Sequence, residues 1–367
     1  MVCPCLLGVE GLVADELRAM GAEQVEPENG RVLFWGDMHM LVRANLCRRY
    51  SERVFVQIGS FVARSFDALF EGVKALPWER WIGRDDIFPV KGRVLSSKLS
   101  SVPDCQKIIK KAVVERLKQR YGINWFAETD TLYQIQFLIL KDRVSVMLDT
   151  SGAGLHKRGY RANAAQAPIK ETLAATIARL ARVRVNGNTV DPFCGSGTLL
   201  IEAALYACNI APGLRRNFAA ERWGQIAPEV WMQEKQRAQD LVYRDARFCG
   251  YGYDVDGAAV ALTLENAKKA GVIQHIRAKQ QEVARFIPET ETGVLVCNPP
   301  YGERLLDVQQ AQALYRVMGN VFEQRQGWSY AIITPDAEFE TCYGRKADKR
   351  RKLYNGMIPC QLYLYFK

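Results

Sequence analysis

The C-terminal half of this 367-residue chain alternates short apolar runs with longer segments of helical periodicity, and this alternation constrains the fold most. A chain that passes repeatedly from strand to helix to strand builds a mostly parallel sheet with helices on its faces. The expected strands lie at residues 189–191, 249–254, 275–279, 293–297, 329–334 and 361–366. The expected helices include residues 168–180, 198–207, 258–270 and 311–323. The sequence therefore predicts an α/β domain that begins near residue 164.

Two smaller α+β units are expected before this domain. The first 50 residues read as strand, helix, strand and helix, and another strand is expected at residues 54–58. The second unit has expected helices at residues 66–75 and 106–120 and two strands, 131–140 and 143–149. Its segment 91–101 is rich in hydroxyl groups and positive charge, which suits either RNA contact or an ordinary polar loop.

Composition excludes several classes of protein. The chain is 48% apolar and 25% charged, as folded proteins are, and no run approaches the roughly 20 apolar residues of a membrane span. Acidic residues at positions 10, 15 and 16 argue against a signal peptide. Ten scattered cysteines without a CxxC pair, together with only three histidines, predict reduced thiols rather than a zinc site. We therefore expect a cytoplasmic protein without a metal site.

Positive charge is distributed unevenly along the chain. Residues 1–160 carry 23 Lys and Arg against 19 Asp and Glu, whereas residues 161–344 carry 20 of each kind. The segment 345–352 holds six basic residues and a single acidic one. A basic surplus outside a neutral block favours an acidic polymer such as nucleic acid as the partner, although a solvated basic surface would give the same counts.

The most specific local pattern is Asp-Pro-Phe-Cys-Gly-Ser-Gly-Thr at residues 191–198, between an expected strand and an expected helix. Its glycines allow a ligand to approach the backbone, and the N-terminus of the helix favours polar ligand groups. The dinucleotide-binding and P-loop patterns are both absent. Asp254 ends the second strand, where a carboxylate can accept hydrogen bonds from a ribose diol, whereas Asp256 suits a helix cap better. Glu282, near the end of the third strand, is a weaker candidate for contact with an adenine amine.

A second pattern, Asn-Pro-Pro-Tyr, follows the fourth strand at residues 298–301. Its prolines remove two backbone donors and stiffen the loop. The amide oxygen of Asn298 and the carbonyl of Pro299 would then face the site as fixed acceptors, and Tyr301 offers a ring on which a base can stack. Acceptors beside a stacking ring can bind an exocyclic amine of a nucleobase.

These two patterns resemble motifs I and IV of class I S-adenosylmethionine-dependent methyltransferases that modify exocyclic nucleobase amines. The form Asn-Pro-Pro-Tyr-Gly-Glu-Arg-Leu at residues 298–305 is similar to that of ribosomal RNA large-subunit N2-guanine methyltransferases with a THUMP domain. The resemblance implies a Rossmann-like class I methyltransferase domain, with a mostly parallel seven-stranded sheet and an antiparallel strand, preceded by a ferredoxin-like unit and a THUMP α+β domain. The implied boundaries are 1–50 for the ferredoxin-like unit (its closing strand extending to about residue 60), 51–150 for THUMP, 151–166 for a linker and 167–367 for the methyltransferase domain with a helical insert at 206–248.

The same resemblance implies an RNA methyltransferase that uses S-adenosyl-L-methionine and forms N2-methylguanosine in 23S ribosomal RNA. The sequence leaves the oligomeric state open, with a homodimer as one option. The residues implied at the target amine are Asn298, Pro299, Pro300 and Tyr301. Those implied around the cofactor are Asp191, Pro192, Phe193, Cys194, Gly195, Ser196, Gly197, Thr198, Asp254, Val255, Glu282 and Asn298, with Pro168 and Thr172 closing one side. Candidates for RNA contact are Lys98, Lys107, Lys110, Lys111, Arg158, Arg161 and Arg304.

Three other interpretations remain open at this point. Methylation of adenine N6 in DNA uses the same Asn-Pro-Pro-Tyr loop, and a tRNA guanine could replace the ribosomal one. A non-catalytic RNA-binding assembly factor could keep the fold and lack the activity. His156 has no nucleophile or orienting acid in a triad arrangement near it in the sequence and is expected to be structural, while Trp78 and Trp81 suit packing as well as RNA contact.

Overall fold

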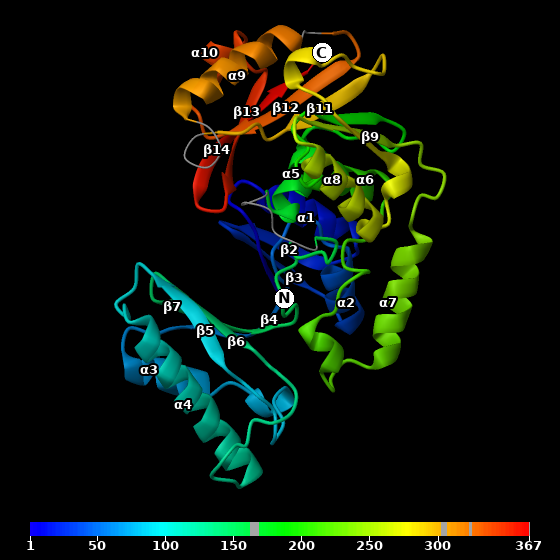
Figure 1. Ribbon diagram of the computed structural model, residues 1–367. Coiled ribbons are helices and arrows are strands. Elements are labelled where there is room, and N and C mark those ends of the chain that lie inside the picture. The colour runs from blue at the N-terminus through cyan, green and yellow to red at the C-terminus, as the bar shows by residue number, and fades with distance from the viewer. Residues whose placement is uncertain (162–168, 302–306, 323–324, 367) are drawn as a thin grey trace.

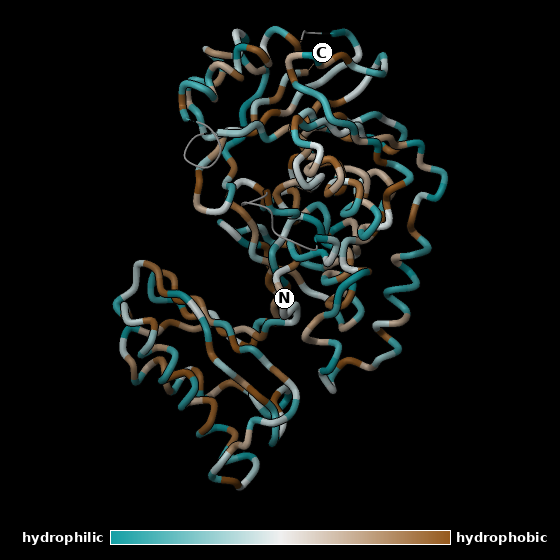
Figure 2. Tube along the Cα trace, in the orientation of Figure 1, coloured by the Kyte–Doolittle hydropathy of each residue, from teal (hydrophilic) through white to brown (hydrophobic). Residues whose placement is uncertain are grey.

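The computed structural model describes residues 1–161, 169–301, 307–322 and 325–366, which form two seven-stranded sheets with helices packed against them (Figure 1). Apolar residues concentrate in the strands and on the inner faces of the helices (Figure 2). All ten cysteines are free, and six of them are buried. In the described parts of the chain, no helix combines the length and the apolar character needed to cross a bilayer.

The first sheet runs through both N-terminal units without a break. Its strands follow the order β2-β3-β1-β4-β7-β6-β5. Their bounds are β1 Val2–Pro4, β2 Glu23–Glu28, β3 Arg31–Trp35, β4 Phe55–Val62, β5 Val90–Leu95, β6 Ile135–Leu140 and β7 Arg143–Asp149. Strand β4 joins the units, since it meets β1 at one end and pairs with β7 along its whole length. The ferredoxin-like unit and the THUMP unit therefore share one sheet.

Helices cover one face of this sheet. They are α1 Glu10–Ala19 and α2 Met38–Cys47 in the first unit, and α3 Phe66–Lys74, the 3-10 turn Trp78–Arg80 and α4 Val102–Tyr121 in the second. Helix α4 begins four residues earlier than expected because the Ser101 side chain accepts a hydrogen bond from Asp104 N and caps it. Strand β5 occupies part of the segment 91–101, for which a polar loop was one expectation; it pairs in parallel with β6.

The second sheet has the order β10-β9-β8-β11-β12-β14-β13. Its strands are β8 Asn188–Asp191, β9 Cys249–Asp254, β10 Ile276–Gln280, β11 Gly293–Cys297, β12 Trp328–Thr334, β13 Lys349–Asn355 and β14 Ile358–Tyr365. The first five strands in this order pair in parallel, and β14 is antiparallel to both of its neighbours. This confirms the expected class I architecture of a mostly parallel sheet with an antiparallel strand.

Helices lie on both faces of this second sheet (Figure 1). On one side are α5 Glu171–Leu180, α6 Thr198–Ala207 and α8 Gly257–Ala270, and on the other are α9 Val308–Val321 and α10 Phe339–Tyr343. Short 3-10 turns, Ile273–His275 and Val283–Arg285, flank β10. An aromatic cluster fills the α9 side, where Phe339 packs against Tyr315 and Tyr363 at centroid distances of 5.0 and 4.7 Å. The carboxyl ends of the parallel strands are left free for a binding site.

The insert between α6 and β9 packs against both N-terminal units. It contains the 3-10 turn Ala219–Arg222 and α7 Pro228–Asp240, which runs beside α2 (Figure 1). Glu234 on α7 lies 2.6 Å from the guanidinium of Arg43 on α2. Trp223 stacks on Tyr133 of the THUMP unit at 4.7 Å and meets Trp81 edge-on at 6.0 Å. Trp81 therefore packs between units, and Trp78 is fully buried, so both tryptophans are packing residues.

Candidate active site

The turn between β8 and α6 adopts a backbone that only glycine accepts without strain at two positions. Gly195 and Gly197 have φ values of +53° and +78°. A Cβ at position 197 would lie 2.8 Å from Cγ2 of Thr263 on α8. Thr263 also donates to the carbonyl of Gly195 at 2.9 Å, and Asn266 donates to the carbonyl of Ser196 at 2.9 Å. Helix α8 therefore holds this turn in one shape.

Asp254 at the end of β9 forms a hydrogen bond with the turn between β8 and α6. Its Oδ2 accepts from the backbone N–H of Gly195 at 2.9 Å, and its Oδ1 accepts from Asp256 N at 3.1 Å. Asp256 caps α8 by accepting from Ala258 N at 2.8 Å, so the capping role belongs to Asp256, as expected. Beside them, the side chain of Val255 is 65% exposed and presents an apolar surface.

Asp191 is a buried acid at the base of the turn, with a residue exposure of 1%. Burial raises the pKa of Asp191 to about 8; the hydrogen bond from Phe193 N, 3.0 Å long, opposes this rise, and the charge of Asp254 adds to it. Without a cation beside it, the Asp191 carboxyl is therefore largely protonated at neutral pH.

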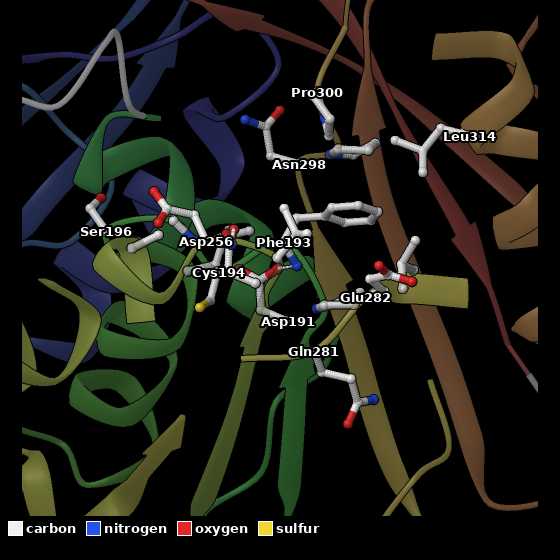
Figure 3. A pocket seen from close by; sticks show the side chains of 18 of the residues that line it. Asp191, Phe193, Cys194, Ser196, Asp256, Gln281, Glu282, Asn298, Pro300 and Leu314 are labelled. Carbon is white, nitrogen blue, oxygen red and sulfur yellow. Dashed lines mark hydrogen bonds between the residues drawn. The ribbon is translucent and has the colours of Figure 1, made fainter. Parts of the chain in front are cut away.

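Asn298 and the residues after it continue directly from the end of β11 at Cys297. Tyr301 is half-buried, and its hydroxyl accepts a hydrogen bond from Nδ2 of Asn355, at the end of β13, over 3.0 Å. Asn298 and Pro300 face Asp191 and Cys194 across an open space, with the ring of Phe193 between them (Figure 3).

Both turns line one pocket of about 920 Å³. The sequence-predicted residues on its wall are Asp191, Pro192, Phe193, Cys194, Gly195, Ser196, Thr198, Asp254, Val255, Glu282, Asn298, Pro299, Pro300 and Tyr301. The wall also contains residues that were not predicted from the sequence: Ile169, Leu199, Asp256, Ala258, Ala259, Leu262, Gln281, Val283, Ala284, Leu314 and Val317. Of these residues, Gln281 could have been predicted from the sequence, because it directly precedes Glu282. The apolar residues of α8 and α9 could not have been predicted, because their helical spacing is that of ordinary core residues.

Thr172 and Pro168 were expected to close one side of the pocket. The hydroxyl of Thr172, in the first turn of α5, instead donates to Oε1 of Glu52 at 3.1 Å, and Thr172 is buried. His156 contacts the same carboxylate at 2.8 Å. Burial opposes ionisation of Glu52, but the hydrogen bond from His156 and the charges of His156 and Lys170 lower its pKa to about 2. Pro168 lies outside the described residues, and the neighbouring Ile169 lines the pocket.

The expected RNA-contacting residues have different surroundings. Arg158 is buried instead of exposed: its guanidinium donates to the carbonyl of Arg49 at 2.7 Å and lies 3.5 Å from Glu202. Arg161 donates to Oγ1 of Thr198 at 2.8 Å and so supports the pocket wall, while Lys110 is paired with Glu128. These three cations are held by partners within the chain.

The other residues expected to contact RNA are three exposed lysines and one arginine that lies outside the described residues. The side chains of Lys98, Lys107 and Lys111 are exposed on the THUMP unit. Arg304 lies outside the described residues.

Comparison with known families assigns all three units. Residues 158–363 match the family model described as "RMKL-like, methyltransferase domain". The chain belongs to this methyltransferase family. Residues 1–55 match "RlmL ferredoxin-like domain" and residues 63–149 match "THUMP domain", so the three kinds of domain occur in the expected order.

Several relatives resemble the chain over its whole length. A Bacillus subtilis protein named "Putative RNA methyltransferase YpsC" is 43% identical over 100% of this chain and 95% of its own length. The "Ribosomal RNA large subunit methyltransferase K/L" of Syntrophotalea carbinolica is 36% identical over 97% of this chain, but the match spans only 52% of that protein. The crystal structure of SMU.472 complexed with SAH is 40% identical, with a TM-score of 0.93 and coverage of 100% and 97% of the two chains.

S-adenosyl-L-methionine is the cofactor that this family and fold imply, and the residues of the pocket suit it. The glycine turn leaves the backbone open, Asp254 supplies carboxylate oxygens at the end of β9, and Val255 supplies an exposed apolar surface for a flat ring. Asp191 is a buried acid on the same wall, suited to a cationic group such as an amino acid ammonium.

Proposed function

We propose that this chain is an S-adenosylmethionine-dependent RNA methyltransferase that forms N2-methylguanosine in 23S ribosomal RNA. The observation that supports it most is the shared pocket, since the turn after β8 and the turn after β11 lie on the walls of the same space. The match of residues 63–149 to the THUMP domain and the names of the Bacillus and Syntrophotalea relatives support RNA as the substrate. Such an enzyme would work in the cytoplasm, where ribosomal RNA is processed.

Asn298, Pro299 and Tyr301 bind the target base in this proposal. The amine of guanine is a poor nucleophile because its lone pair is delocalised into the ring. Oδ1 of Asn298 and the carbonyl oxygen of Pro299 accept hydrogen bonds from the two N–H groups of this amine. This orients the nitrogen lone pair toward the cofactor side of the pocket. Pro300 stiffens the turn, and the ring of Tyr301 holds a base that has left its stack. Catalysis is then mainly positioning, without a covalent intermediate.

The other wall holds the cofactor, which when bound supplies a methyl group on a positively charged sulfur. Asp254 accepts hydrogen bonds from the ribose hydroxyls, and Glu282 is assigned to the adenine amine. The wall residues that contact the remainder of the molecule are Pro192, Phe193, Cys194, Gly195, Ser196 and Thr198. Lys98, Lys107 and Lys111 contact RNA phosphates from the exposed surface of the THUMP unit.

Methyl transfer from labelled S-adenosylmethionine to three substrates tests the proposal. The purified full chain is incubated with unmodified 23S ribosomal RNA, with unmodified tRNA and with plasmid DNA, and the product nucleoside is identified by mass spectrometry. We expect N2-methylguanosine in 23S RNA only. N6-methyladenine in DNA, or methylguanosine in tRNA alone, would overturn the assignment in favour of the corresponding alternative. Calorimetry that detects no cofactor binding would favour a non-catalytic assembly factor.

A further inference from the structure

The hairpin of β13 and β14 forms one edge of the second sheet, and the last residue of β13 lies beside the pocket. Strand β13 stands last in the strand order, so one of its edges pairs with no other strand in the described parts of the chain. Its final residue, Asn355, donates to the hydroxyl of Tyr301 at 3.0 Å. The outer edge of the sheet therefore leads directly to the residue proposed to hold the target base.

Four consecutive basic residues, Lys349 to Lys352, begin this edge strand, and all four are exposed. Arg350 is compensated by an ion pair with Glu340. Within the described residues, Lys349, Arg351 and Lys352 form no ion pair with any acid. The neighbouring acid, Asp348, accepts a hydrogen bond from Phe366 N at 2.6 Å. Among the residues that the structure describes, three cations on this edge therefore have no acidic partner, and the Lys352 ammonium lies 5.8 Å from the centre of the Tyr354 ring.

The register of the hairpin spreads these charges over both sides of the edge. Lys349 and Arg351 pair with Leu364 and Leu362, so their side chains share the face of those leucines, while Lys352 points to the opposite face. Lys349 and Arg351 are two residue steps, about 7 Å, apart on one face, and Lys352 adds a third cation on the other face. The edge therefore presents positive charge to a phosphate backbone on both of its sides.

We propose that this basic edge of β13 holds the phosphate backbone of the RNA strand next to the target nucleotide. The inference rests on the function proposed above and adds a binding surface to it. The hairpin (red in Figure 1) lies on the same side of the molecule as the THUMP unit (cyan). A strand bound by the THUMP unit can thus continue along β13 to the pocket, where Asn355 links the edge to Tyr301.

The test compares two triple variants of the full chain that lose the same charge. The first, K349Q/R351Q/K352Q, removes the three cations of the edge for which no ion pair occurs within the described residues. The control, R244Q/R247Q/K268Q, removes three exposed cations located just before β9 and in the last turn of α8, at the opposite end of the sheet from the pocket. Binding to unmodified 23S ribosomal RNA is measured at several salt concentrations, and cofactor binding is measured by calorimetry.

We expect the edge variant to bind this RNA about tenfold or more weakly, and its log–log slope against salt to fall by about 2, at about 0.7 per lost phosphate contact on a single strand. Its cofactor affinity and that of the control remain at the wild-type value. An edge variant with the wild-type slope, or a control with an equal loss, overturns the proposal. Self-association of the edge variant with normal RNA binding also overturns it, because the cations would then only protect a free strand edge.

The outcomes also separate this surface from the proposed function. If the wild type binds RNA through the edge but transfers no methyl group, the function fails and the surface stands. If the wild type methylates 23S RNA and the edge variant is unchanged in RNA binding, the surface fails and the function stands. A wild type that does not bind this RNA overturns both.

Discussion

The buried carboxyl of Asp191 predicts a pH-dependent difference in stability between the wild type and the variant Asp191→Asn. Below about pH 4 this carboxyl is protonated in both the folded and the unfolded chain, so ionisation imposes no penalty. As the pH rises toward the folded pKa of about 8, only the unfolded chain ionises, and this favours unfolding. Asparagine keeps the acceptor for Phe193 N and does not titrate.

The magnitude follows from about 1.36 kcal/mol for each pH unit in which only the unfolded state ionises. Between pH 5 and pH 7.5, the free energy of unfolding of Asp191→Asn should rise relative to the wild type by roughly 3 kcal/mol. Urea unfolding of the cofactor-free proteins at both pH values measures this change. The exposed Asp256 provides a control exchange of the same kind, Asp256→Asn, that retains a capping acceptor. A difference between Asp191→Asn and wild type that is independent of pH would refute the reasoning.

Three further predictions concern the two turns and the insert. Asn298→Ala should bind S-adenosylmethionine with wild-type affinity in calorimetry and lose at least about 100-fold in kcat, because it lacks one acceptor for the amine; near-normal turnover would contradict this role. Gly197→Ala should lower the free energy of unfolding by about 1–3 kcal/mol, because φ is +78° and Thr263 occupies the space; an unchanged urea midpoint would count against it. Trp223→Ala should cost about 3–5 kcal/mol and expose the junction at Tyr133 to limited proteolysis, and a wild-type cleavage pattern would argue otherwise.

The central features of the site were predictable because they are local in sequence. Residues 191–198 and 298–301 combine strand ends, glycines and prolines within a few positions, and the α/β alternation places both turns at the carboxyl edge of one sheet. The strands β5 and β13 were harder to predict. Both are edge strands with exposed Lys and Arg, which obscure the period of two.

Residues whose partners are distant in the sequence were assigned less well. Thr172 bonds to Glu52 and Arg158 bonds to Arg49, more than 100 positions away, so their burial depends on how the linker packs against the N-terminal unit. No local pattern in residues 155–173 reveals this packing. The junctions between units therefore had to be read from the structure.

The most direct test of the central claim is to locate the methyl group in ribosomal RNA from cells with the protein, without it, and with only its Asn298→Ala form. Mass spectrometry of 23S RNA fragments identifies the modified nucleotide. We expect one N2-methylguanosine that is present with the wild type and absent in the other two strains. An identical modification pattern in all three strains would contradict it.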